Sequence, residues 1–172
     1  MLLLLLSACF VGGGDRSWSL DPDVHGVDLR LSNGSVTVLP GSEEELYIEW
    51  SGGGLGNRKI RPEPVLVGDT VLLDARCGGT CGGDITVLLP PGLEVAGTVE
   101  RGDLLVDLEQ RSNIDACVAA GSLELRVPAG AWDLDLEVGA GSLVVQEVLH
   151  DPQAPDWISA CVAAGDLTVL GL

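Results

Sequence analysis

The stretch GDLLVDLEQRSNIDACVAAGSLELRV, residues 102–127, decides the fold. It contains, twice, a Gly followed by Asp or Ser and then by Leu or Ile. Between residues 81 and 172 the pattern occurs at Gly83-Asp84-Ile85, Gly102-Asp103-Leu104, Gly121-Ser122-Leu123, Gly141-Ser142-Leu143 and Gly165-Asp166-Leu167. These glycines are 19, 19, 20 and 24 residues apart. A nearly fixed period of this size is typical of proteins built from stacked repeats.

Apolar residues alternate with other residues on both sides of each glycine. In the unit from Gly102 to Gly121 the apolar positions are Leu104, Val106, Leu108, Ile114, Ala116 and Val118. A period of two indicates a strand with one buried face, so each unit is predicted to be strand, turn, strand and glycine corner. One unit cannot cover its own apolar face, and units must therefore stack. We expect an all-β fold, with a parallel β-solenoid of two-strand coils of about twenty residues over 76–172, each glycine bend lying over the one before.

The region 23–75 is predicted to be an antiparallel β cap that is continuous with the solenoid in one domain. The segment Ser32-Asn33-Gly34-Ser35 separates two alternating runs, and Asn-Gly in such a place is a strong hairpin signal. Gly68-Asp69 separates Val65–Val67 from Thr70–Leu73 in the same way. A cap of this kind would cover the otherwise open edge of the first coil.

Residues 1–22 contain a predicted targeting segment and a linker. Residues 1–8 are mostly apolar and lead into Leu6-Ser7-Ala8-Cys9, which resembles the bacterial lipobox. The resemblance implies cleavage before Cys9 and lipidation of Cys9, although no positive charge precedes the short Leu run, as a signal peptide would require. The run is too short to span a bilayer. Residues 9–22 include Gly12-Gly13-Gly14 and predict a flexible tether.

Composition limits the partners. The chain has 172 residues, a length that suits one domain, and a formal net charge of −17. Nucleic acid and anionic lipid both attract basic surfaces, so this charge argues against either as a partner. Solubility is the simplest explanation of the charge.

Three features together resemble a known family. They are Gly68-Asp69-Thr70-Val71-Leu72-Leu73, the segment Ile85–Gly92 with its Pro90-Pro91-Gly92 turn, and the glycine corners about every twenty residues. This combination looks like the "putative adhesin" family of bacterial β-solenoid envelope proteins and covers roughly residues 27–172. The resemblance implies a solenoid displayed at the cell envelope, with no assigned chemistry and no cofactor.

Four cysteines follow Cys9. Cys77 and Cys81 are close enough in sequence to form a local disulfide, which an exported protein would favour. Cys117 and Cys161 both lie four residues before a corner glycine. If coils of about twenty residues stack in chain order, Glu137 lies between them and they are too far apart to bond. A longer double coil would make them neighbours. Zinc is a weaker alternative, because the spacings do not match a finger.

Two surface features suggest contacts. Asp115, Asp135 and Glu137 face outward on successive coils, and Asp115 and Asp135 would lie on adjacent rungs. A cation such as Ca²⁺ could relieve their repulsion, although a solvated acidic face is the simpler alternative. The segment from His150 to Trp157 contains the extra residues of the longest repeat, and such insertions often form binding loops. His150 and Trp157 are therefore candidate partner contacts, although Trp157 could instead fold back over the stack.

No catalytic motif stands out. The sequence has two His, and it lacks a Gly-x-Ser-x-Gly elbow, a phosphate loop and a His-Glu-x-x-His motif. We therefore expect a non-catalytic, lipid-anchored envelope protein that serves as an adhesin-like scaffold or interaction surface, binding an envelope protein or a polysaccharide. Two alternatives are a carbohydrate-active β-helix enzyme and an envelope sensor or docking module. We assign no catalytic residue, metal or cofactor.

Overall fold

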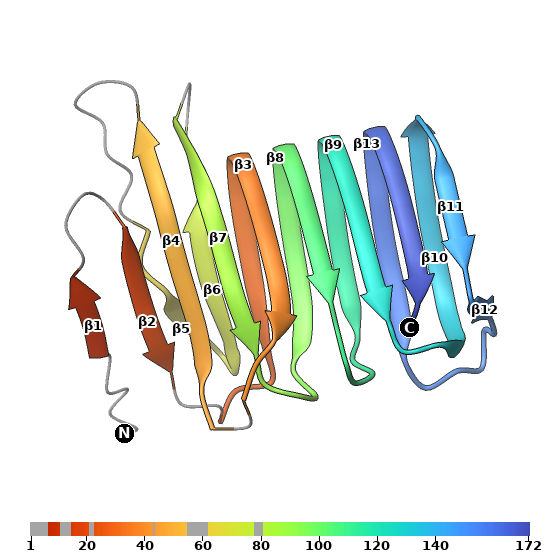
Figure 1. The fold of residues 1–172 in the computed structure, drawn as a ribbon, viewed down its shortest axis with the longest axis horizontal. Coiled ribbons are helices and arrows are strands. Elements are labelled where there is room, and N and C mark those ends of the chain that lie inside the picture. The colour runs from red at the N-terminus through yellow and green to blue at the C-terminus, as the bar shows by residue number, and fades with distance from the viewer. Residues whose placement is uncertain (1–6, 11–14, 21–22, 43, 55–61, 78–80) are drawn as a thin grey trace.

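The computed structural model describes residues 7–10, 15–20, 23–42, 44–54, 62–77 and 81–172. In these residues the fold is all β, without a helix, and thirteen strands join in one mixed sheet. Figure 1 shows the strands side by side in a long row. Within the same ranges there is no helix long and apolar enough to cross a membrane.

Four long strands form the middle of the row: β3 (Gly26–Pro40), β8 (Glu94–Asp107), β9 (Ile114–Val127) and β13 (Trp157–Gly171). Each turns back on itself at its glycine, so that its two halves lie one in front of the other in Figure 1. In β9 the bend is at Gly121, whose φ of 140° is a conformation that other residues resist. A Cβ there would also overlap the carbonyl oxygen of Gly102 on the next strand.

Both halves of each long strand face a shared core. Val106 and Leu125 are fully buried, and so are Ile114 and Ile158 from the opposite halves. The predicted alternation is therefore confirmed in these strands. Neighbouring long strands pair in parallel and in register, with Gly34 opposite Gly102 and Gly165 opposite Gly121. The apolar side chains thus stack in ladders along the row.

The order of the strands differs from the order of the chain. Along the row the sequence is β7 (Cys81–Leu89), β3, β8, β9, β13 and β10 (Gly130–Ala140), so each end contains an exchange. At one end β3 lies between β7 and β8. At the other end β13 lies between β9 and β10. The expectation that each bend lies over the preceding one is therefore wrong at both ends, because parallel pairing of similar strands does not require neighbours in sequence.

The N-terminal end of the row is antiparallel. There β1 (Ser7–Phe10) pairs with β2 (Arg16–Leu20), β2 with β4 (Leu46–Gly54), and β4 with β7. Behind them, β5 (Val65–Val67) and β6 (Thr70–Ala75) form the predicted hairpin at Gly68-Asp69. The strands β1, β2 and β4 therefore lie at the edge of the row beside β7, whereas β6 also pairs in parallel with β3.

Two predictions for this region are wrong. The segment Ser32–Ser35 is a glycine corner, and β3 around it pairs in parallel with β6, β7 and β8. Asn-Gly between alternating runs suits either a hairpin or a corner, and only the neighbouring strands decide between them. The predicted flexible tether is wrong over Arg16–Leu20, because Trp18 and Leu20 are buried there and β2 pairs with β4. The tether's Gly12-Gly13-Gly14 lies outside the described residues.

Candidate interaction surface

The end of the row opposite β1 is open. Its last rung consists of β10 in one layer and β11 (Leu143–Gln146) in the other, both paired to β13, and β12 (Val148–His150) pairs with the start of β10. Leu143 and Val145 continue the apolar ladders opposite Leu167 and Val169. They are 48% and 38% exposed, whereas their neighbours on β13 are fully buried. The core is therefore uncovered on its outer side at this end, and Val145 is less buried than its place in the repeat predicted.

The backbone of β10 has one edge toward β13 and one edge facing outward. The N–H of Asp133 donates to the carbonyl of Asp156 on the inner side, at 3.0 Å. The N–H of Leu134 donates to Nδ1 of His150 on the outer side, at 3.1 Å. In a parallel strand the N–H and C=O of one residue point to the same neighbour, and the direction alternates along the strand. The amides of Leu136 and Val138 therefore point outward, where no described strand pairs with them.

The two sequence-based candidates for partner contacts flank the inserted turn: His150 ends β12, and Trp157 begins β13. His150 covers the first outward amide of β10, since its ring accepts the hydrogen bond from Leu134. Trp157 is 38% exposed and lies opposite Asp133 at the start of β13. The backbone N–H of Trp157 donates to Oδ1 of Asn113 at 3.3 Å. Their role as partner contacts stays a prediction.

The predicted acidic stack is rearranged. Asp135 lies opposite Ser159, and Ser159 lies opposite Asp115, so the two aspartates are separated by a full strand. The expectation that Asp115 and Asp135 occupy adjacent rungs is wrong because β13 is inserted between them. Across the described ranges, no three His, Cys, Asp or Glu side chains are placed to hold a metal ion. Asp115, Asp135 and Glu137 remain exposed acidic residues.

Three acidic residues elsewhere in the row are each paired with the Arg two residues further along the chain. Arg76 pairs with Asp74, Arg30 with Asp28, and Arg126 with Glu124. The hydrogen bond from Arg76 lowers the pKa of Asp74, and the pKa of Arg126 is raised chiefly by its hydrogen bond to Glu124. In contrast, none of the ion pairs found in the described part of the chain involves Asp133, Asp135 or Glu137 of the last rung.

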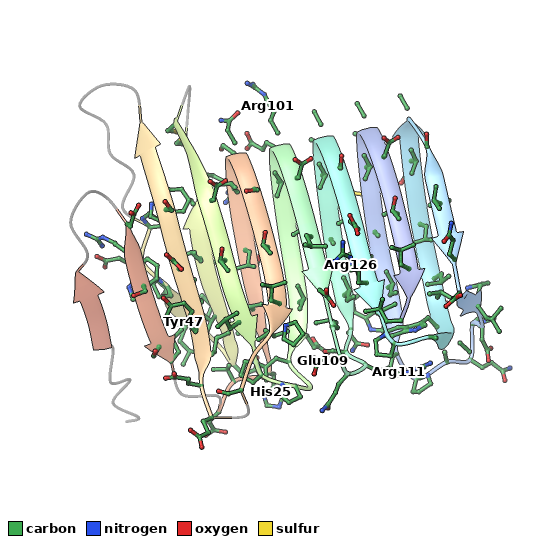
Figure 2. The ribbon with its side chains drawn as sticks, in the orientation of Figure 1. His25, Tyr47, Arg101, Glu109, Arg111 and Arg126 are labelled. Atoms are coloured by element: carbon green, nitrogen blue, oxygen red, sulfur yellow. A yellow bond between two sulfur atoms is a disulfide. The ribbon has the colours of Figure 1, made fainter. Side chains whose placement is uncertain are left out.

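Arg111 links the turns that precede β10 and β13, a role that the sequence did not reveal. Its guanidinium donates to the carbonyls of Ala131 and Ala129 at 2.7 and 3.3 Å, and lies 3.7 Å from a carboxylate oxygen of Asp156. It also stacks over the ring of Trp132, 4.9 Å from the centroid. Trp132 is fully buried, as predicted for the inward ladder. Figure 2 shows Arg111 at the lower end of the strands, near the turns that lead into β10 and β13.

The cysteines form two bonds. Cys77 and Cys81 are joined in a local disulfide. Cys117 and Cys161 are also joined, with Cα atoms 4.6 Å apart, because β9 and β13 are direct neighbours. The argument that coils of about twenty residues would keep this pair apart is therefore wrong. The insertion of β13 between β9 and β10 brings the two sulfurs together.

The glycine corners carry a polar ladder that sequence reasoning also missed. The residues after the glycines, in the order of the row, are Asp84, Ser35, Asp103, Ser122, Asp166 and Ser142. Each Asp accepts a hydrogen bond from the backbone N–H of the next Ser, at 3.0–3.1 Å. Asp and Ser alternate from strand to strand along the row, but they do not alternate from corner to corner along the chain. This difference indicates the order of the strands.

Away from the open end, one hollow lies at the foot of β3, β7 and β8. It is lined by Pro40, Pro91, Leu108 and Glu109 among others, and its volume is about 40 Å³. Small-molecule sites are typically roughly 300–1,000 Å³. The hollow has room for a few water molecules. His25 lies nearby at the surface, with its ring 3.3 Å from Asp69.

Comparison with known proteins places the fold. No family model matches the chain, and no curated protein matches it. Among solved structures, a "putative cell adhesion protein" from Clostridium sporogenes aligns over 90% of this chain and 97% of its own, with a TM-score of 0.56 and 9% identity. A "putative adhesin" from Parabacteroides distasonis aligns over 92% and 98%, with a TM-score of 0.34 and 9% identity. One from Bacteroides fragilis aligns over 91% and 97%, with a TM-score of 0.29 and 13% identity.

Proposed function

We propose that the chain is a non-catalytic, adhesin-like scaffold of the bacterial cell envelope that presents an interaction surface at the open end of the row, opposite β1. The observation that carries the proposal is the last rung, where apolar core side chains and backbone amides face outward. Exposed apolar surface next to polar residues is typical of sites that bind other macromolecules. The similarity in fold to the "putative cell adhesion protein" from Clostridium sporogenes is in keeping with this proposal.

The fold suits a scaffold that holds this end away from its attachment point. We interpret the parallel stack of β3, β8, β9, β13 and β10 as a β-solenoid whose strand order departs from the chain order at β3 and at β13. The antiparallel strands close one end of the row, and the Cys117–Cys161 bond ties two central coils together. In a stack of this kind each coil is stabilised by its neighbours.

The attachment point would be Cys9. It lies in β1, opposite Ser17 of β2, at the end of the row farthest from β10 (Figure 1). A lipid on Cys9 would hold this end at the membrane and leave the open end pointing away. The net charge of −17 keeps the body of the protein from adhering to anionic lipid. The partner would be an envelope protein or a polysaccharide.

The test combines location and activity. We expect the full chain, expressed in a bacterial host with an alkyne-labelled fatty acid, to carry the label and to sediment with membranes. Cys9→Ser should abolish both, whereas Cys117→Ser with Cys161→Ser should leave the label in place. The purified chain should show no turnover on a panel of acidic and neutral polysaccharides. Label on the Cys9→Ser variant, or turnover of any polysaccharide, would contradict the proposal.

A further inference from the structure

We infer that the outward edge of β10 binds an extended segment of a partner protein in which apolar residues alternate with Lys or Arg. The segment would add one strand to the sheet, next to residues 135–140. This inference rests on the proposed function, because it names the kind of partner that the open end would take. Three features of the last rung support it: its backbone, its apolar side chains and its charge.

The backbone of β10 is partly covered and partly open. The strand β12 pairs with Gly130–Trp132, and His150 accepts the next outward hydrogen bond. Beyond that point the amides of Leu136 and Val138 face outward along a stretch of about six residues, or about 20 Å. An open sheet edge of this length is a template for an added strand, since main-chain hydrogen bonds supply affinity without regard to side chains.

The apolar side chains would set the register of the added strand. Leu136 and Val138 point toward the core and are only partly buried, and Leu143 and Val145 face them from the other layer with exposures of 48% and 38%. In the interior of the stack the same positions are covered by the next coil. An added strand with an apolar residue at every second position would cover them in the same way.

The charge of the outward face selects the other residues of the partner. Asp135 and Glu137 are exposed and alternate with the inward residues. Opposite charges on adjacent strands stabilise a pair, and like charges directly opposite destabilise it. Lys or Arg at the alternate positions of an added strand would therefore lie beside Asp135 and Glu137.

A second copy of this chain fits the same edge poorly. In an antiparallel pairing of two β10 strands centred on Leu136, Asp135 of each copy would lie opposite Glu137 of the other. Centred on Glu137, the two Glu137 side chains would face each other. Each copy also carries a net charge of −17. Repulsion at the edge and between the bodies thus favours a partner strand that carries positive charge.

The test uses short synthetic peptides and the full chain. The probe is a fluorescent peptide of alternating Val and Lys, capped at both ends, with binding followed by fluorescence anisotropy. One comparison peptide has Glu in place of Lys. Another keeps the Lys and carries N-methyl groups at alternate residues, which block hydrogen bonding to a sheet edge and leave the charge intact. We expect the Lys peptide to bind about tenfold or more tightly than either comparison peptide.

Variants locate the site. Asp135→Lys with Glu137→Lys should reverse the preference, so that the Glu peptide binds more tightly than the Lys peptide. Asp115→Lys with Glu109→Lys is the matched control, because it changes the net charge equally at exposed positions away from the edge. The control should keep the preference of the parent chain. Circular dichroism of all variants would establish that the sheet is intact.

Each alternative outcome overturns the inference in a distinct way. Equal binding of the N-methylated peptide would mean charge attraction without an added strand. Equal weakening by the control variant would mean a general effect of net charge, and concentration-dependent dimers that compete with the peptide would make a second copy the occupant. If the Lys peptide fails to bind while the lipid label and the absence of turnover are observed, the edge inference fails and the proposed function stands.

Discussion

The exchanged order of β10 and β13 can be tested with three leucines that occupy one position of the repeat. Leu123, Leu143 and Leu167 each lie two residues after a corner glycine. In the structure Leu123 and Leu167 each have a leucine neighbour on both sides, and Leu143 has one only, Leu167. If the coils stacked in chain order, Leu143 would be the one in the middle and Leu167 would be at the end.

The expected loss of stability follows from burial. Leu123 and Leu167 are 1% and 0% exposed. Truncation of either to Ala should lower the free energy of unfolding by about 2–5 kcal/mol, because buried apolar surface is lost and an enclosed cavity is left in the core. Leu143 is 48% exposed. Its truncation removes about half the burial of a leucine and leaves a space that solvent fills, so about 1 kcal/mol is expected.

Urea unfolding followed by tryptophan fluorescence measures all three, because the chain has four Trp. The m-value should stay unchanged, so that midpoints compare directly. The structure predicts similar large losses for Leu123→Ala and Leu167→Ala and a small loss for Leu143→Ala. A large loss for Leu143→Ala together with a small one for Leu167→Ala would refute the exchanged order.

Three further predictions concern the cross-link, the corners and the charged pairs. Peptide mapping without reduction should recover Cys117 bonded to Cys161, and replacing both with Ser should lower the unfolding free energy by about 4 kcal/mol in the chain-entropy estimate. Ser122→Asp would place a third carboxylate between those of the two adjacent corners, so the melting temperature should fall and then partly recover in high salt. The pKa of Asp74 is lowered by Arg76, so this pair stabilises the fold above the unfolded pKa and the contribution is lost as pH falls through the folded pKa. NMR titration of Arg76→Gln should show the pKa of Asp74 rising toward its ordinary value, and an unchanged pKa would contradict the assignment.

The sequence was sufficient for the elements of the stack and insufficient for their order. Alternation around Gly102 and Gly121 predicts which side chains face inward, because a strand has a period of two in any sheet. The alternation does not say which strand lies next to which. Both β10 and β13 alternate in the same way, and either could pair with the edge of β9. The order was accessible only through the corner residues. In chain order two aspartates, Asp84 and Asp103, would be adjacent, and the exchange separates them with Ser35.

The candidate surface depended on that order. The sequence places His150 and Trp157 in an inserted loop, and the structure finds both at the open end. It could not indicate that β10 forms the last rung, because the chain continues beyond β10 into β13. The exposed edge at Leu136 and Val138, and the separation of Asp135 from Asp115, both follow from the insertion of β13 and are invisible to local patterns.

The insertion of β13 also bears on how the protein is made. Synthesis completes β10 before β13, yet β13 lies on the inner side of β10 and against β9. A nascent chain that added each strand as it emerged would pair β10 with β9 and occupy the place of β13. Folding at this end must therefore wait or reverse a step, and such transient mispairing is a known hazard of β proteins. Closure of the Cys117–Cys161 bond would then make the late arrangement permanent.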